Sequence, residues 1–413
     1  MLSTFNTHSE WPPMKSFNPD LFRQQFPALS EAGCYLDSAA TALKPLSMIN
    51  ATKEYYAHNG ATVHRSAHTA AQQATELFDN ARRLVAQLLN AASEQQIVWT
   101  KGTTEAINLV AQSYARPRLQ PGDEIIVTES EHHSNLIPWL MVAKQTGAKV
   151  VKLPLNKWFM PDLSQLPTLL TSKTKILAIG HMSNVTGGCP DLRMAITLAH
   201  QNGVIVMVDG AQGVVHSPPD VQQLDVDFYA FSAHKLYGPT GIGALYGKAA
   251  LLAEMSPWQG GGKMLTQASF DGFEAQPVPE CFEAGTPNIA GVIGVGATLS
   301  WLNTQDVAEA ERYACALAQA AYDQLSSIPG FISYRAPGSS LLAFNIEGFH
   351  HSDVATLLSE QGVAIRSGQH CAQPLLDAIG VSGTLRASFA PYNQLADVDR
   401  LYDALTHALS LLE

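Results

Sequence analysis

The stretch DFYAFSAHKLYGPTG, residues 227–241, joins a short apolar strand pattern to a lysine and a turn that contains glycine and proline. Lys235 therefore follows the end of a strand that we predict to be buried. An amine held beside an apolar strand end loses its charge readily, and imine formation needs the uncharged amine. A surface lysine in a turn is the simpler alternative, so the choice depends on the ends of the other strands.

Short runs rich in valine and isoleucine recur on both sides of Lys235, and helical periodicity fills the gaps between them. The predicted strands are 96–100, 124–128, 148–154, 175–180, 203–210, 227–232 and 241–247. Strands that alternate with helices imply a mostly parallel sheet covered on both faces, with ligands bound beyond the carboxyl ends of the strands. The sequence thus predicts an α/β fold and places any chemistry at those ends.

Composition excludes several classes of protein. The net charge is −11 over 413 residues, so no basic face is available for nucleic acid. No run reaches the roughly 18 apolar residues of a membrane span, and the N-terminus lacks a signal-peptide pattern. The five scattered cysteines include no CxxC pair, which argues against a disulfide framework or a zinc site. We expect a cytoplasmic protein without a metal or a membrane partner.

The chain divides at a glycine- and proline-rich tract, 256–288, which we expect to be a long functional loop. Beyond it we predict a helical segment over 289–327, then short strands and two further helices. The expected organisation is a flexible extension (1–16), a segment packing with the small domain (17–34), a large domain (35–287) and a small α+β domain carrying the Cys371 loop (288–413).

Three other strand ends carry polar groups. Asp209 ends an apolar strand and could hold a pyridinium N–H, or simply cap a helix. The run Gly102–Thr104 precedes a helix whose first amides would attract a phosphate, although an ordinary capping box fits the same residues. His132 could stack on an aromatic cofactor and exchange protons, but lone histidines usually have no such role. Together with Lys235 these groups describe a pyridoxal phosphate site.

The sequence also carries a specific series of motifs: YLDSAATALKP, HRSAH, GTTEAIN, EHHSNLIPW, SNVTGG, DGAQG, FSAHKLYGPTG, EAGTPN and RSGQHCAQP. In this order, from about Phe17 onward, the sequence resembles the fold-type I pyridoxal phosphate enzymes. Among them it resembles the class V, NifS-like cysteine desulfurases of the SufS/CsdA group. Two positions depart from the group, Ala233 where glycine is common and Ser134 where alanine is common.

The resemblance implies a role for each matching residue. Lys235 would form the Schiff base with pyridoxal 5'-phosphate and move the Cα proton, Asp209 would bind the pyridine nitrogen, Gln212 the phenolic oxygen, and His132 would stack on the ring. The implied phosphate ligands are Thr103, Thr104, Ser232, His234 and, reaching over from a second subunit, Thr286, which implies a homodimer.

A substrate carboxylate needs a guanidinium, and Arg386 lies at a predicted strand end in TLRASFAP. A surface salt bridge is the alternative. By resemblance Arg386 binds the amino-acid carboxylate with help from Asn184, and Arg366 and His64 lie near the substrate side chain or the site mouth.

Cys371 stands in RSGQHCAQP. Taking sulfur from cysteine requires a thiolate, and Arg366 and His370 as positive neighbours would lower the pKa of this thiol. Mobility of the loop would let the thiol move from attack to delivery. Buried packing is the usual fate of a free cysteine, and we expect it for the others, Cys34, Cys189, Cys281 and Cys315.

The implied reaction converts L-cysteine to L-alanine and leaves the sulfur on Cys371 as a persulfide for a SufE-like (CsdE-type) acceptor protein. Cysteine sulfinate and selenocysteine are further expected substrates, and the sulfur could serve iron–sulfur cluster assembly or tRNA modification. Kynureninase-like hydrolysis and phosphoserine-type transamination use the same fold, but neither needs Cys371. A scaffold that only binds a partner would not need Lys235 with Asp209, His132 and Arg386.

Overall fold

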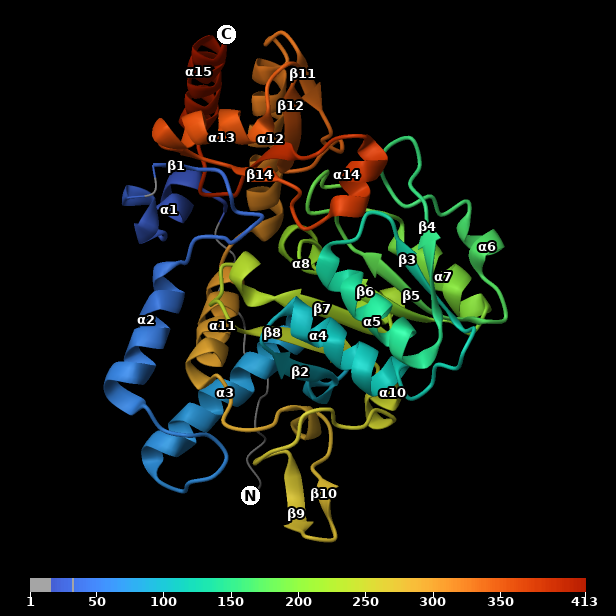
Figure 1. Ribbon diagram of the computed structural model, residues 1–413. Helices are drawn as coiled ribbons and strands as arrows, with labels where there is room; N and C mark the ends of the chain where they lie inside the picture. The colour runs from blue at the N-terminus through green and yellow to red at the C-terminus, as the bar shows by residue number, and fades with distance from the viewer. Residues whose placement is uncertain (1–15, 32) are drawn as a thin grey trace.

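The computed structural model describes residues 16–31 and 33–413, and a seven-stranded sheet forms its centre (Figure 1). The strands run in the spatial order β2 (Ile97–Thr100), β8 (Gly243–Gly247), β7 (Phe228–Ser232), β6 (Ile205–Asp209), β5 (Thr174–Gly180), β3 (Glu124–Thr128) and β4 (Lys149–Leu153). Strand β8 is antiparallel to both of its neighbours, and all other pairs are parallel. Each strand expected from the sequence is present, so the mostly parallel α/β sheet is confirmed.

Helices cover both faces of this sheet because successive strand residues point to opposite sides. In β3, Ile125 and Val127 join one apolar cluster while Ile126 joins the other. The cluster of Ile126 includes α3 (Thr69–Leu88), α7 (Leu192–Gln201) and α11 (Ile289–Leu302). The cluster on the opposite face includes α4 (Thr103–Leu109), α5 (Ile137–Thr146) and α10 (Ala249–Ala253). The remaining helices of this part of the chain are α2 (Leu46–Glu54), α6 (Leu166–Leu169), α8 (Gly213–His216) and α9 (Val221–Leu224).

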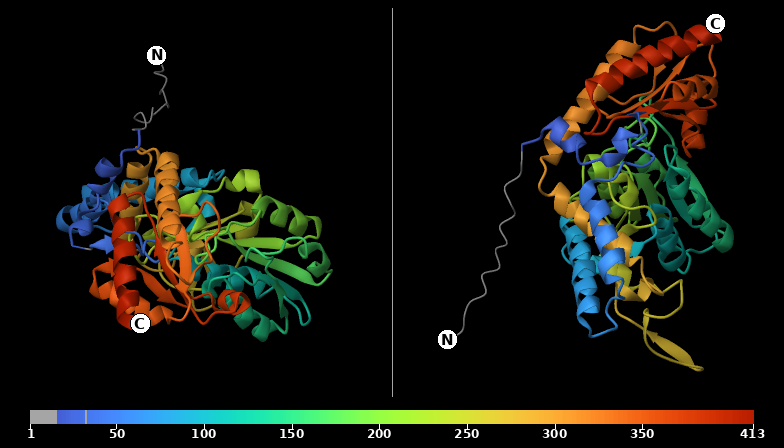
Figure 2. Two further views of the ribbon diagram at one scale, coloured as in Figure 1. Left: turned by 90° about the horizontal axis from the view of Figure 1, so that it is seen from above. Right: turned by 90° about the vertical axis from the view of Figure 1, so that its left-hand side faces the viewer.

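A second, four-stranded antiparallel sheet forms a separate lobe with the C-terminal helices (Figure 2). Its spatial order is β11 (Phe331–Ser333), β12 (Leu341–Ile346), β15 (Thr384–Ser388) and β14 (Arg366–Gly368). The helices of the lobe are α12 (Val307–Leu325), α13 (His351–Glu360), α14 (Gln373–Ile379) and α15 (Leu395–Leu412). Strand β1 (Cys34–Tyr35) pairs with β13 (Val363–Ala364) beside it.

Two expectations about the middle of the chain were wrong. The helical segment expected over 289–327 is two helices, because α11 ends before Asn303 and the Asp306 side chain caps the new helix α12. The expected loop 256–288 contains a hairpin of β9 (Leu265–Ser269) and β10 (Gly272–Ala275). Since α11 packs on α2 and α3, we propose that the two domains divide after α11 rather than at residue 288.

The N-terminal segment contacts both parts of the molecule. Helix α1 (Pro19–Arg23) places Phe22 against Trp301 and Tyr237, and Arg23 Nη1 donates to the carbonyl of Tyr392 at 2.6 Å. Of the extension expected to be flexible, residues 1–15 lie outside the described residues. Among the helices that the structure describes, none combines the length and the apolar character needed to cross a membrane.

A buried ion pair joins α3 to the segment before α11. Arg82 Nη1 and Nη2 donate to Glu283 Oε1 and Oε2 at 2.6 and 3.0 Å, and Oε1 also accepts from the amide of Trp99. The two side chains are 8% and 4% exposed. Lys263 Nζ lies 3.6 Å from Oε2, which is too distant for a direct hydrogen bond.

We expect Arg82→Ala to lower the free energy of unfolding by about 3–5 kcal/mol, because the carboxylate of Glu283 would stay buried without its main partner. Urea unfolding measures this difference. Replacing both residues together, Arg82→Met with Glu283→Leu, should cost less than the single substitution. A loss below about 1 kcal/mol for Arg82→Ala would contradict this account of the ion pair.

Candidate active site

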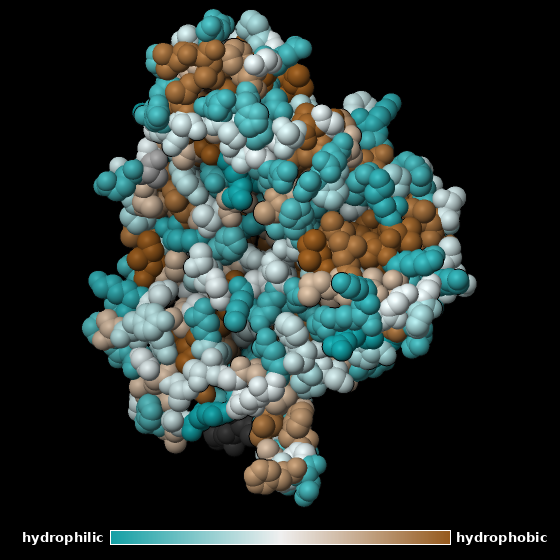
Figure 3. Space-filling model, viewed as in Figure 1, coloured by the Kyte–Doolittle hydropathy of each residue, from teal (hydrophilic) through white to brown (hydrophobic). Residues whose placement is uncertain are grey.

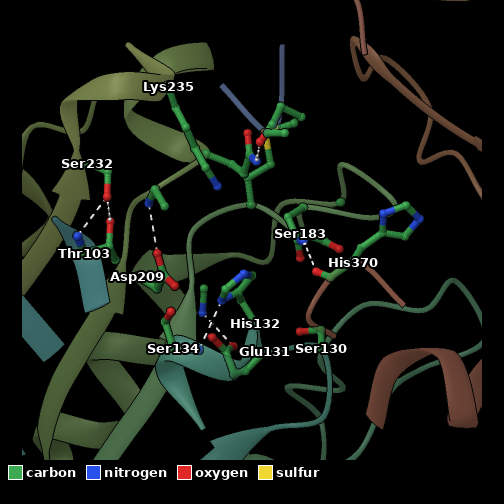
Figure 4. A pocket seen from close by; sticks show the side chains of 18 of the residues that line it. Thr103, Ser130, Glu131, His132, Ser134, Ser183, Asp209, Ser232, Lys235 and His370 are labelled. Carbon is green, nitrogen blue, oxygen red and sulfur yellow. Dashed lines mark hydrogen bonds between the residues drawn. The ribbon is translucent and has the colours of Figure 1, made fainter. Parts of the chain in front are cut away.

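One pocket lies at the carboxyl ends of β3, β5, β6 and β7, and residues of the second sheet close its other side (Figure 4). The structure brings many of the predicted site residues into this pocket: Thr103, Thr104, His132, Asn184, Asp209, Gln212, Ser232, His234, Lys235, Arg366 and Arg386. They come from both sheets, so the site is built between the two parts of the chain.

Lys235 stands in the single turn that follows β7, and its side chain reaches into the pocket (Figure 4). Burial lowers the pKa of its ammonium group to about 8, Asp209 offsets part of this effect, and Arg386 lowers the pKa further. About a tenth of the amine is therefore uncharged at pH 7, far more than for an ordinary lysine. The structure thus favours a reactive amine over the simpler alternative of a surface lysine.

Asp209 ends β6 in the wall of the pocket, where its carboxylate is buried. Its Oδ1 accepts a hydrogen bond from the amide of Ala211 at 2.9 Å, and burial raises its pKa. A buried carboxylate with so little hydrogen bonding fits a cationic partner such as a protonated ring nitrogen. Nearby, Gln212 donates one amide hydrogen to the carbonyl of Ala39 at 2.8 Å.

Hydroxyl groups gather where β2 meets α4. Ser232 Oγ accepts from the amide of Thr103 at 2.8 Å, and Thr104 Oγ1 lies 2.7 Å from Ser134 Oγ. Gly102 has a φ of 154°, and a Cβ there would lie 3.0 Å from Ser232 Oγ, so only glycine leaves the space open. These donors fit a phosphate group. The sequence prediction did not assign Ser134 to this cluster.

His132 lines the same pocket as a neutral imidazole. Its Nδ1 accepts from the amide of Ser134 at 3.0 Å, and burial lowers its pKa to about 4. The preceding Glu131 is buried and accepts hydrogen bonds from the amide of Gly180 and from Asn135 Nδ2, both at 2.7 Å. Glu131 therefore ties the turn of His132 to the end of β5. The sequence analysis did not identify Glu131 as a site residue, although a charged residue so close to the end of a buried strand indicates a functional position.

Arg366 and Arg386 stand directly opposite each other on β14 and β15. Like charges across a strand pair repel, and burial lowers the pKa of Arg386 to about 10. Arg386 donates to Asp37 Oδ1 at 3.2 Å and to the carbonyl of Asn184 at 2.7 Å, while its Nε has no partner. A substrate carboxylate fits this pair because it supplies the missing acceptor and negative charge.

Cys371 is exposed and does not itself line the pocket, but it directly follows His370, which lies in the pocket wall. His370 Nε2 lies 2.9 Å from Thr384 Oγ1, and burial lowers the pKa of this imidazole to about 3. His370 is thus neutral, and its expected role as a positive neighbour of the thiol was wrong. Asn184 Nδ2 donates to the carbonyl of His370 at 2.7 Å and so holds the loop.

The other cysteines differ in their burial. Cys34 and Cys281 are buried as expected, but the same expectation was wrong for Cys189, which is exposed, and for Cys315, which is half-buried. Cys189 follows two glycines at the edge of the pocket, and Cys315 Sγ lies 3.4 Å from Glu311 Oε1. The structure describes all five as free thiols.

His64 and Thr286 do not line the pocket. His64 is exposed, and its Nε2 lies 2.8 Å from Asp79 Oδ1. Thr286 is also exposed, in a surface groove with Gly241 and Trp258. Within one chain neither residue reaches the predicted site, so the role of Thr286 in a second subunit stays a prediction.

Comparison with known proteins places this pocket in a family. The family model described as Aminotransferase class-V matches residues 34–401. The chain belongs to the class-V aminotransferase family. It is 63% identical over 399 residues to the Escherichia coli protein Cysteine desulfurase CsdA, covering 97% of this chain and all of that protein. It is 50% identical to a probable cysteine desulfurase of Vibrio cholerae, covering 96% of this chain and 99% of that protein.

Solved structures agree with this assignment. A crystal structure of the E. coli cysteine desulfurase CsdA (S-sulfonic acid) matches with a TM-score of 0.93 over 96% of this chain and all of that one. The apo cysteine desulfurase of Thermococcus onnurineus matches with a TM-score of 0.92 at 33% identity, covering 96% of this chain and 99% of that one. The resemblance to class V enzymes, the fold-type I architecture and pyridoxal phosphate as the cofactor are confirmed. The Lys235 amine, the Asp209 carboxylate and the hydroxyl cluster fit this cofactor.

Proposed function

We propose that this protein is a pyridoxal phosphate-dependent cysteine desulfurase, which forms L-alanine from L-cysteine and collects the sulfur on Cys371. The observation that carries the proposal is the exposed thiol of Cys371, directly after His370 in the wall of a pocket that holds a reactive lysine and two facing arginines. Transamination and kynureninase-like hydrolysis have no use for such a thiol. The identity to CsdA over almost the whole chain supports the same reaction.

Each residue has a defined task in this reaction. Bound pyridoxal phosphate withdraws electrons from the Cα of the amino acid. Asp209 would pair with the ring nitrogen, neutral His132 would lie against the ring, and Arg386 would orient the substrate carboxylate. The Lys235 amine would hold the cofactor covalently and would then serve as the base that takes the Cα proton and the acid that returns a proton to carbon.

Cys371 performs the step that the pocket residues cannot. Its thiolate attacks the substrate Sγ, an S–S bond forms, and the electron pair of the broken Cβ–S bond stays with carbon, which takes up a proton. One cysteine and one thiol thus become one alanine and one persulfide. We include cysteine sulfinate and selenocysteine as substrates because their leaving groups depart more readily.

We expect the apoprotein to capture pyridoxal phosphate faster as pH rises, with a midpoint near pH 8. Only the uncharged amine of Lys235 attacks, and its pKa is about 8. The rate should increase about tenfold per pH unit below that value and level off above it. Stopped-flow absorbance of the reconstituting protein measures this. Asp209→Asn removes the charge that raises this pKa, so its midpoint should be lower. A rate independent of pH would contradict the assignment.

The proposal includes a SufE-like acceptor protein. Beside the Cys371 loop, α5 exposes three apolar side chains, Ile137, Leu140 and Met141, at 45%, 45% and 48%. Figure 3 shows apolar side chains gathered over the region of α5 and β4. An exposed apolar surface next to an exposed nucleophile suits a protein that docks to receive the sulfur. Iron–sulfur cluster assembly and tRNA modification are both compatible destinations.

The proposal also includes a homodimer in the cytoplasm. Thr286 and His64 are exposed away from the pocket of their own chain, and a second subunit would give both residues a role. Five free thiols are typical of a reducing compartment.

Alanine release from L-cysteine, with and without a SufE-like acceptor, tests the proposal. We expect alanine in both cases and a faster release when the acceptor removes the persulfide. Formation of a keto acid instead of alanine would favour transamination and contradict the proposal. Lack of stimulation by the acceptor would contradict only its acceptor part.

A further inference from the structure

The helix that follows Cys371 does not cap its own N-terminus. Helix α14 begins at Gln373, its N-cap Ala372 has no side-chain acceptor, and Pro374 has no amide hydrogen to donate. The first amides of a helix need partners from outside the helix. For Gln373 the partner is an imidazole from a distant segment, because the amide of Gln373 donates to His133 Nε2 at 3.3 Å.

His133 also contacts Cys371, through its own backbone amide. The amide of His133 donates to the carbonyl of Cys371 at 2.7 Å. His370 and Cys371 both have left-handed backbone angles, with φ of 52° and 55°. Two such residues in succession are costly, and they persist only where surrounding contacts impose the conformation. His133 supplies two of those contacts, one at Cys371 and one at Gln373.

His133 further connects the loop to the cofactor pocket. It follows His132, which lines the pocket, and Glu131 anchors the same turn to β5. Ser134, on the other side of His133, bonds to Thr104 in the hydroxyl cluster. The short turn 131–135 thus contacts the cofactor pocket through one histidine and the nucleophile loop through the next.

We infer that His133 is a positioning residue that holds the Cys371 thiol in place for attack on the substrate sulfur. The inference rests on the proposed function. Its imidazole acts as a cap supplied from another part of the chain, and without it the loop would leave the attacking conformation for part of the time. The loop is held at two places, by His133 at the amide of Gln373 and by Asn184 at the carbonyl of His370.

Three variants of the holoenzyme test the inference. His133→Ala removes the acceptor for the Gln373 amide, whereas His133→Gln offers an amide oxygen in its place. His350→Ala is the matched control, because His350 caps the exposed start of α13 through Nδ1 at the same 3.3 Å. The measurements are the single-turnover rate of persulfide formation from L-cysteine, hydrogen exchange of the peptide that contains Gln373, and the cofactor absorbance spectrum.

For His133→Ala we expect persulfide formation to slow about five- to tenfold, the effect of losing one helix cap. Hydrogen exchange at Gln373 should be faster and the cofactor spectrum unchanged. His133→Gln should recover most of the rate, and His350→Ala should match the wild type. This recovery separates positioning from a general loss of structure.

The inference is overturned if His133→Ala forms persulfide within twofold of the wild-type rate, or slows without faster exchange at Gln373. An altered cofactor spectrum in that variant would also overturn it, because His133 would then act through the cofactor. If the wild type forms no persulfide from L-cysteine, the proposed function fails. Hydrogen exchange then decides separately whether His133 holds the loop.

Discussion

A Lys235→Ala protein is expected to lose turnover of L-cysteine by at least about 10⁴-fold and to release its cofactor on dialysis. The amine is both the covalent link to the cofactor and the base for the Cα proton, and no neighbour in the pocket duplicates these tasks. His132 cannot replace it as a strong base, since burial lowers the pKa of that imidazole to about 4. Alanine release and the absorbance of the dialysed protein measure the two losses.

Lys44 provides the matched control for this prediction. Burial lowers the pKa of Lys44 to about 8 as well, but its Nζ donates to the carbonyl of His234 at 2.8 Å and the residue does not line the pocket. Lys44→Ala should therefore keep the covalent cofactor. If Lys235→Ala retained L-cysteine turnover within tenfold of the wild type, the assignment of the reactive amine would be wrong.

Replacement of Cys371 should lower the turnover of L-cysteine much more than that of cysteine sulfinate and selenocysteine. Cys371→Ala is expected to lose L-cysteine desulfuration by at least about 100-fold, because the reaction proposed here needs the Cys371 thiolate to take the sulfur. Cysteine sulfinate and selenocysteine should keep measurable turnover, since their leaving groups depart without thiolate attack. Parallel assays of alanine formation from the three substrates measure the difference.

Cys189→Ala is the control for this second prediction, because Cys189 is also exposed and lies near the edge of the same pocket. It should turn over all three substrates like the wild type. Equal loss on the three substrates in Cys371→Ala would contradict a distinct role for the thiol and would point to damage of the pocket itself.

The strand ends explain why much of the site was predictable from the sequence. Asp209 and Lys235 each follow an apolar run, and parallel strands bring such ends to one edge of a sheet. Local patterns therefore sufficed for the sheet and for the large-domain half of the pocket. The resemblance to known motifs then added Arg386 and Cys371, which local patterns alone would have left undecided.

Properties that arise from burial and from distant pairing could not be predicted in this way. The neutral state of His370 comes from its burial against Thr384, and the register that sets Arg366 opposite Arg386 comes from the pairing of β14 with β15. The link from His133 to Gln373 joins segments 240 residues apart. The break between α11 and α12 could have been predicted from the sequence, because aspartate, here Asp306, is common at helix N-caps.

The most direct test of the account is the mass of the protein after holoenzyme reacts with one equivalent of L-cysteine in the absence of an acceptor. We predict one alanine per subunit and the added mass of one sulfur atom on the peptide that contains Cys371, removed by a reducing agent. Alanine formed with free sulfide while Cys371 stays unmodified, or no alanine at all, would contradict the proposed transfer of sulfur to this residue.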